Sequence, residues 1–194
     1  MLENYIDQIE VAIEVIKANF PMVISWVFLL YGIHLFNFIL SYRLNILGIH
    51  SRKVIGLPGV FLAPFLHASF NHVFFNSFPL LILMLFVSLN GKLLFYKISL
   101  SLIVTSGLLI WLLGRKAIHV GASALIMGYW GFLFMQTYQH PNIISVMLVI
   151  VLIYYFGVSF IASLLPGKKG VSWEGHFLGF LAGLTCYHFM LYRF

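Results

Sequence analysis

The chain is poor in charge, and above all in acidic side chains. Of its 194 residues only 8% are charged and five are acidic, whereas 62% are hydrophobic and the mean hydropathy is +1.02. Average soluble domains carry about 25% charged residues, so this chain lacks the polar groups that a water-facing surface requires. The composition therefore predicts a protein whose main solvent is lipid.

The missing residues also exclude several kinds of chemistry. The chain has a single aspartate, which excludes a two-aspartate intramembrane protease and paired-carboxylate hydrolysis. It has no His-Glu-x-x-His string, the common zinc protease signature. Its one cysteine, Cys186, allows no internal disulfide. Its eleven basic residues are scattered between apolar runs, so we expect no nucleic-acid partner.

The apolar runs predict an all-α, polytopic membrane protein, a bundle of six transmembrane helices within residues 21–194. Residues 41–66 are rich in glycine, proline and basic residues, and their length predicts a structured first loop, since compact connections are usually shorter. The six predicted spans cover residues 21–40, 70–89, 93–113, 122–138, 142–165 and 173–192.

Residues 1–20 carry most of the acidic side chains. Glu3, Asp7, Glu10 and Glu14 recur at helical spacing, and isoleucines line the other face. This pattern predicts an amphipathic helix at the membrane interface. A positive N-terminal region is missing, so the segment is not expected to be a signal peptide.

Polar residues gather at one end of the predicted bundle. Successive spans alternate in direction, so spans two, four and six begin on the same side of the membrane. Near these beginnings lie His67, His72, Asn76, Ser123 and His176, with His67 just before span two. His72 and Asn76 are four residues apart and therefore share one helical face.

Small residues predict close packing of spans four and six, because they let helix backbones approach each other. The fourth span is short, so Ser123 is expected below the membrane surface, with the loop carrying Gly121 lining a water-filled cavity. The two stripes of small residues are Ala124, Gly128 and Gly131 on span four, and Gly179 and Gly183 on span six.

The residues at this end suit acyl transfer. A hydroxyl becomes a good nucleophile when a base takes its proton, and Ser123 and His176 fit this pair. Glu174 lies two residues from His176 on a helix and does not share its face, so we predict a dyad without a carboxylate. His72, Asn76 and the Ser123 amide are candidates to stabilise the oxyanion.

The same residues resemble those of the rhomboid intramembrane serine proteases over most of residues 60–185. His67-Ala-Ser-Phe-Asn-His72-Val-Phe-Phe-Asn76 is similar to the family's His-x4-His-x3-Asn motif. Gly121-Ala122-Ser123-Ala124 resembles its Gly-x-Ser-Gly motif. Gly175-His176-Phe-Leu-Gly179, followed by Gly183, resembles its Ala-His-x-x-Gly-x3-Gly motif. The three motifs occur in the family's order on alternate predicted spans, which makes the resemblance to this family specific.

The resemblance implies a six-span serine endopeptidase that cleaves single-span membrane proteins within or beside the bilayer, without a cofactor or metal. Ser123 would be the nucleophile, and His176 the general base and then acid. His72 and Asn76 would form the oxyanion site, with His67 and Gly121 in supporting roles. The expected partners are single-pass membrane substrates and membrane lipids.

The family usually keeps its N-terminus in the cytoplasm, which implies a bacterial inner membrane protein whose active site opens outward. In that orientation four basic residues lie inside and seven outside. This distribution is the reverse of the positive-inside rule.

Three alternatives remain. A rhomboid-like pseudoprotease that binds transmembrane helices is favoured by Ala124, which stands where the family usually has glycine. A haem or metal protein would use His67, His72 and His176 as ligands. A transporter would need substrate-coupling groups, and no acidic residue lies deep in a predicted span.

Overall fold

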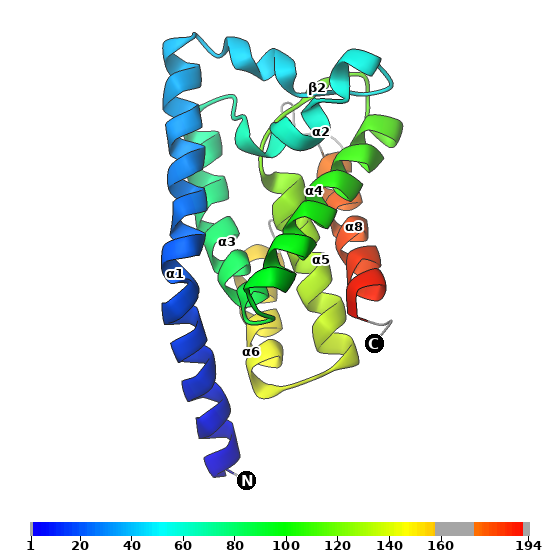
Figure 1. Ribbon diagram of the computed structural model, residues 1–194. Helices are drawn as coiled ribbons and strands as arrows, with labels where there is room; N and C mark the ends of the chain where they lie inside the picture. The colour runs from blue at the N-terminus through cyan, green and yellow to red at the C-terminus, as the bar shows by residue number, and fades with distance from the viewer. Residues whose placement is uncertain (1, 158–172, 192–194) are drawn as a thin grey trace.

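The computed structural model describes residues 2–157 and 173–191, which are mostly helical (Figure 1). The predicted helical class is therefore confirmed. The long helices are α1 (Leu2–Ile39), α3 (Phe70–Ser88), α4 (Lys92–Leu113), α5 (Ser123–Gln139), α6 (Ile143–Leu152) and α8 (Trp173–Leu191), and a π-helical turn, Ile153–Gly157, follows α6.

Three of the described helical segments are long and apolar enough to cross a membrane: Ile6–Ile39, Phe70–Ser88 and Lys92–Leu113. They correspond to the first three predicted spans. Helices α5, α6 and α8 begin where the other three were predicted, but α5 has only 17 residues and part of the span 142–165 lies outside the described residues. The count of six spans stays a prediction.

Helix α1 joins two segments that the sequence analysis separated at residue 20. It runs unbroken over 38 residues, with Pro21 inside it. A proline within a helix removes one backbone hydrogen bond, a loss that does not end the helix here. The interfacial position of residues 1–20 stays a prediction.

The first loop is structured. It contains the strand β1 (Ile49–His50), which pairs antiparallel with β2 (Ile118–His119) just before α5. The loop is therefore tied to the segment that leads into the predicted nucleophile. Its remaining elements are the 3-10 turns η1 (Arg43–Leu47), η2 (Val54–Gly56) and η3 (Ala63–Phe65) and the short helix α2 (Gly59–Leu62).

Arg52 and Trp111 anchor this loop to the end of α4. Nη1 of Arg52 donates to the carbonyl oxygens of Leu112 and Gly114, at 3.1 and 2.8 Å. Nε1 of Trp111 donates to the carbonyl oxygen of Lys53, at 2.8 Å. The two bonds from Arg52 use carbonyl groups at the end of α4 that the helix itself would leave unpaired.

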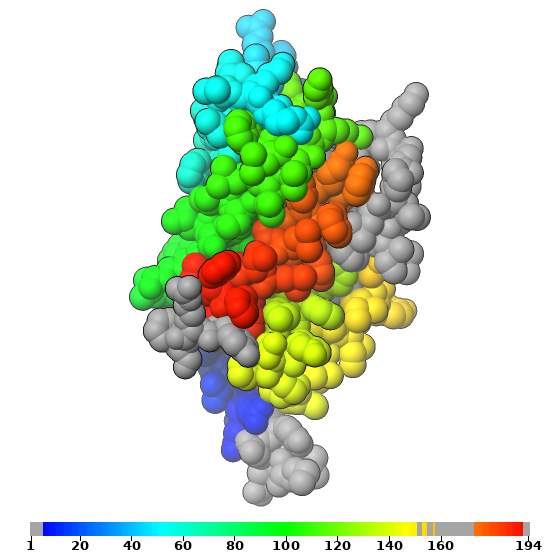
Figure 2. All heavy atoms as spheres, turned by 90° about the vertical axis from the view of Figure 1, so that its right-hand side faces the viewer, coloured from blue at the N-terminus to red at the C-terminus, as the bar shows by residue number. Residues whose placement is uncertain are grey.

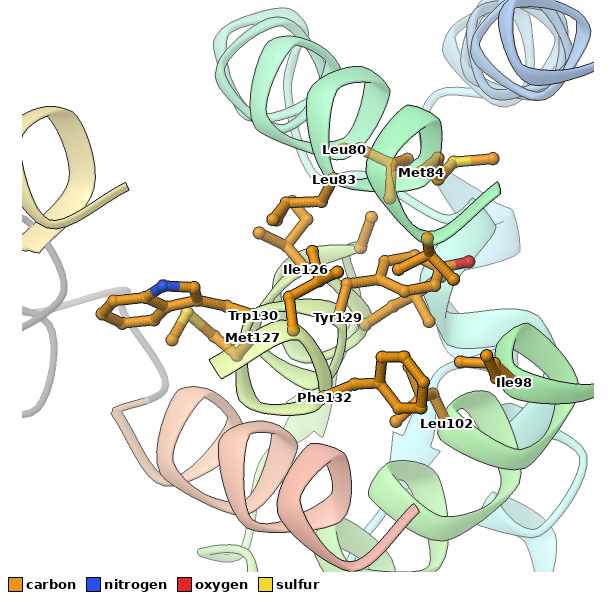
Figure 3. Close-up of a cluster of buried hydrophobic side chains, with 14 of the residues drawn as sticks. Leu80, Leu83, Met84, Ile98, Leu102, Ile126, Met127, Tyr129, Trp130 and Phe132 are labelled. Carbon is orange, nitrogen blue, oxygen red and sulfur yellow. The ribbon is translucent and has the colours of Figure 1, made fainter. Parts of the chain in front are cut away.

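Helix α5 lies at the centre of the apolar core (Figure 3). Its Tyr129 and Phe132 are fully buried, and the buried side chains around them come from α3, such as Leu83, and from α4, such as Ile98 and Leu102. Helices α4 and α8 lie side by side on one face of the molecule (Figure 2). Helix α5 is therefore packed by neighbouring helices on several sides.

Candidate active site

Helices α5 and α8 approach each other through backbone contacts. A methyl group added to Gly179 would meet the carbonyl oxygen of Ala124, and one added to Gly183 would meet that of Gly128. The predicted small-residue stripes therefore face each other. Because Ser123 begins α5 and His176 lies in the first turn of α8, this packing brings both to the same end of the helix pair.

A cavity of about 500 Å³ opens at this end. Its wall combines α3, the segment before α5, and the starts of α5 and α8. Among its lining residues are His72, Asn76, Gly121, Ser123 and His176. The structure thus brings together five of the six residues singled out from the sequence.

The sixth residue, His67, lies behind the cavity wall and is completely buried. Its Nε2 accepts hydrogen bonds from Nδ2 of Asn76, at 3.1 Å, and from the backbone amide of Ala122, at 3.4 Å. His67 therefore links the side chain of Asn76 on α3 to the backbone just before Ser123. Asn76 keeps a second N–H that this bond does not use.

Gly121 occupies a backbone conformation that favours glycine, with φ of +117°. A Cβ at this position would lie 2.7 Å from the ring of His72, so a side chain here would displace the imidazole. The Gly121 amide donates to the carbonyl oxygen of Ala63 at 2.9 Å. The turn before Ser123 is thus held by the first loop on one side and packed against His72 on the other.

Ser123 is half-buried at the first position of α5. Amides at a helix N-terminus have no partner within the helix and carry partial positive charge, which suits a developing oxyanion. The described residues include no hydrogen bond between Ser123 and His176. Catalytic hydrogen bonds are often long in unliganded enzymes and shorten when substrate binds.

Within the described residues, no carboxylate accepts a hydrogen bond from Nδ1 of His176. Its Nδ1 is buried and has no hydrogen-bond partner within residues 2–157 and 173–191. Glu174 instead lies near Arg115, with 3.9 Å between its carboxylate oxygen and Nε of the arginine. This geometry agrees with the sequence argument that Glu174 and His176 do not share a face.

Ala124 does not obstruct the contact between α5 and α8. Its backbone faces Gly179, while its methyl group packs against a small cluster that includes Ile49, Ile110 and Leu178. The methyl group is accommodated beside the cavity, and the close approach of the two backbones depends on Gly179.

Several residues that shape the site were missed from the sequence. Ser69 caps α3, its Oγ accepting from the His72 amide at 3.2 Å, and a serine before an apolar run is a signal that could have revealed it. Ala63 holds Gly121 through its carbonyl oxygen, which no residue pattern reveals. Arg115 and His119 line the cavity without belonging to any motif recognised in the sequence.

The fold and the cavity define a helical membrane protein with a polar site at one end. Residues 56–194 match the family model of the rhomboid domain. The chain therefore belongs to the rhomboid family, and it is an integral membrane protein.

Uncharacterized mycobacterial proteins are similar to most of the chain. Proteins from Mycobacterium bovis and Mycobacterium tuberculosis are each 34% identical over 171 residues, which cover 84% of this chain and 71% of theirs. A protein from Mycobacterium leprae is 31% identical over 173 residues, covering 84% of this chain and 68% of its own.

Proposed function

We propose that the chain is an intramembrane serine endopeptidase that cleaves single-span membrane proteins. The observation that carries the proposal is the convergence of Ser123, His176, His72, Asn76 and Gly121 on one cavity. A nucleophile, a base and amide donors that line one cavity are the groups that acyl transfer requires.

In this proposal the imidazole of His176 takes the proton from the Ser123 hydroxyl as its oxygen attacks the scissile carbonyl carbon. The oxyanion is stabilised by the Ser123 amide, the free N–H of Asn76 and the ring of His72. His176 then protonates the departing amine. Water, deprotonated by His176, hydrolyses the acyl-enzyme and restores the hydroxyl.

Two neighbours position these groups. His67 bonds to both Asn76 and the Ala122 amide and so fixes their positions relative to each other. Gly121 leaves room for the ring of His72. The metal-site alternative has less support, because the described residues include no group of three or more His, Cys, Asp or Glu side chains placed to hold one metal ion.

A fluorophosphonate probe tests the proposal, because it labels an activated serine without requiring a known substrate. In detergent solution we expect wild-type protein to be labelled, and Ser123→Ala and His176→Ala to lower the rate by about 10³-fold or more. Ser25→Ala on α1 and His140→Ala are the matched controls, because both side chains are exposed away from the cavity. They should be labelled like wild type.

The alternative, a pseudoprotease that binds transmembrane helices, gives a different result. Folded wild-type protein would remain unlabelled. If Ala124→Gly then restored labelling, the methyl group beside the cavity would be what impairs the site. Absence of labelling in both proteins would contradict the protease proposal.

A further inference from the structure

A second cavity, of about 470 Å³, lies between the first loop and the segment that leads into β2. Basic side chains dominate its lining: Arg52 and Lys53 from the first loop, Lys116 from the segment before β2, and His50 on β1. Ala117 and Ile118 line both this basic cavity and the candidate active site. The two cavities therefore share a wall.

Within the described part of the chain, no ion pair joins a carboxylate to a basic residue of this cavity. Four of the five acidic residues lie within the first 14 residues, at the N-terminal end of α1, which is at the opposite end of the molecule from the first loop (Figure 1). The fifth, Glu174, lies beside Arg115. Lys53 and Lys116 are exposed and take part in no ion pair within the described part of the chain.

Arg52 is held in place at the edge of this cavity. Its Nη1 is committed to the carbonyl oxygens of Leu112 and Gly114, which fixes the side chain along the end of α4. A guanidinium has five N–H donors, so its other nitrogens retain donors for a ligand. The cavity thus combines one fixed guanidinium with two lysine ammonium groups, a combination suited to a phosphate group.

The apolar side chains of the first loop indicate where such a phosphate comes from. Val54, Ile55 and Ile46 are 79%, 70% and 61% exposed in the described structure, although all three are large hydrophobic residues. Val54 and Ile55 directly follow Lys53. In an integral membrane protein these side chains are best solvated by lipid, which places the adjacent basic residues at the level of the lipid headgroups.

We propose that the basic cavity, lined by His50, Arg52, Lys53 and Lys116, binds the phosphate of an anionic phospholipid headgroup. The inference is independent of the proposed protease activity, because none of these four residues lines the cavity of Ser123.

Native mass spectrometry of the purified full chain in a neutral detergent tests the site, with phosphatidylglycerol as the probe and phosphatidylcholine as the uncharged comparison. The test variant is Lys53→Gln/Lys116→Gln. Each basic residue near an anionic lipid strengthens binding about fivefold, so the double variant should bind phosphatidylglycerol about 25-fold more weakly than wild type.

Lys92→Gln/Lys97→Gln is the matched control. It removes the same charge from two exposed lysines on α4, and it should bind phosphatidylglycerol within about twofold of wild type. Thermal midpoints of both double variants should equal that of wild type, because surface substitutions rarely change stability by much.

Inorganic phosphate distinguishes the sources of the ligand. If millimolar phosphate displaces phosphatidylglycerol from wild type, the phosphate group alone is recognised; if it does not, the complete lipid is required, and both results support the site. Equal binding of phosphatidylcholine, an equal loss in the two double variants, or no binding to wild type would overturn the proposal.

Discussion

The hydrogen bonds of His67 determine its protonation state. A backbone amide such as that of Ala122 can only donate, so Nε2 of His67 accepts and the neutral ring carries its proton on Nδ1. Burial, followed by the nearby His72, lowers the pKa of His67 to about 3. This residue, which lies outside the spanning helices, is therefore a neutral support at every physiological pH.

This lowered pKa predicts how stability depends on pH. The unfolded chain binds a proton at His67 near pH 6.5, whereas the folded chain does so only near 3. The contribution of His67 to the free energy of unfolding is therefore fully present above pH 6.5. It is lost as pH falls toward 3, by about 1.4 kcal/mol per pH unit. Thermal unfolding of wild type and His67→Gln between pH 7 and 4.5 measures it.

His67→Gln removes the titrating group and keeps a hydrogen-bonding side chain. We expect its thermal midpoint to be lower than that of wild type at pH 7 and to fall less steeply with acid. Other buried histidines contribute equally to both proteins, so the difference in slope belongs to His67. Parallel slopes would show that the ring does not remain neutral in the folded protein.

At the scale of elements, the contact between α5 and α8 decides whether the site forms. Gly179 and Gly183 lie directly against the backbone of α5. The two helices carry the nucleophile and the base of the proposed reaction, so any separation of the helices also separates Ser123 from His176.

Gly183→Ala should destabilise the protein. Its new methyl group would meet the carbonyl oxygen of Gly128 and lie 2.6 Å from the backbone nitrogen of Phe132, neither of which can move without shifting α5. Overpacking of this kind costs about 1–3 kcal/mol, or roughly 3–10 °C in thermal midpoint for a chain of this size.

Gly32→Ala on α1 is the matched control, since nothing lies within 4 Å of its added Cβ. Alanine favours the helix by up to about 1 kcal/mol over glycine, so this variant should be as stable as wild type or slightly more so. An equal fall in thermal midpoint in both variants would contradict the proposed backbone contact.

At the scale of the whole molecule, charge is separated along the helices. Acidic residues gather at the N-terminal end of α1, while Arg43, Arg52, Lys53, Arg115 and Lys116 lie at the end that carries the first loop and the site (Figure 1). The positive-inside rule would place the site in the cytoplasm. The orientation of the family favours the outside, and we propose that the chain follows it in a bacterial inner membrane.

Cysteine labelling in intact cells decides the orientation. A membrane-impermeant maleimide should label Arg43→Cys in the first loop, and should label Lys92→Cys, at the start of α4, only after permeabilisation. The native Cys186 is 2% exposed and should contribute little background. Labelling of Lys92→Cys alone in intact cells would show that the site faces the cytoplasm.

Much of the fold and of the site was predictable from the sequence. Lipid solvation follows from the shortage of charge, and the helix positions follow from apolar runs bounded by glycine and proline. The grouping of His72, Ser123 and His176 follows from the alternation of spans. The continuity of α1 past residue 20 was not predictable, because a proline usually marks a helix boundary.

By itself, the sequence determined the class of protein, the order of its helices and the residues that meet at one end, since these depend on composition, periodicity and span direction. Only the tertiary structure decided how these residues are held. The Gly121 amide donates to the carbonyl oxygen of Ala63, and His67 accepts two hydrogen bonds. Arg52 and Trp111 anchor the first loop to the end of α4. These contacts mostly use backbone atoms, which every residue carries, so no pattern of side chains reveals them.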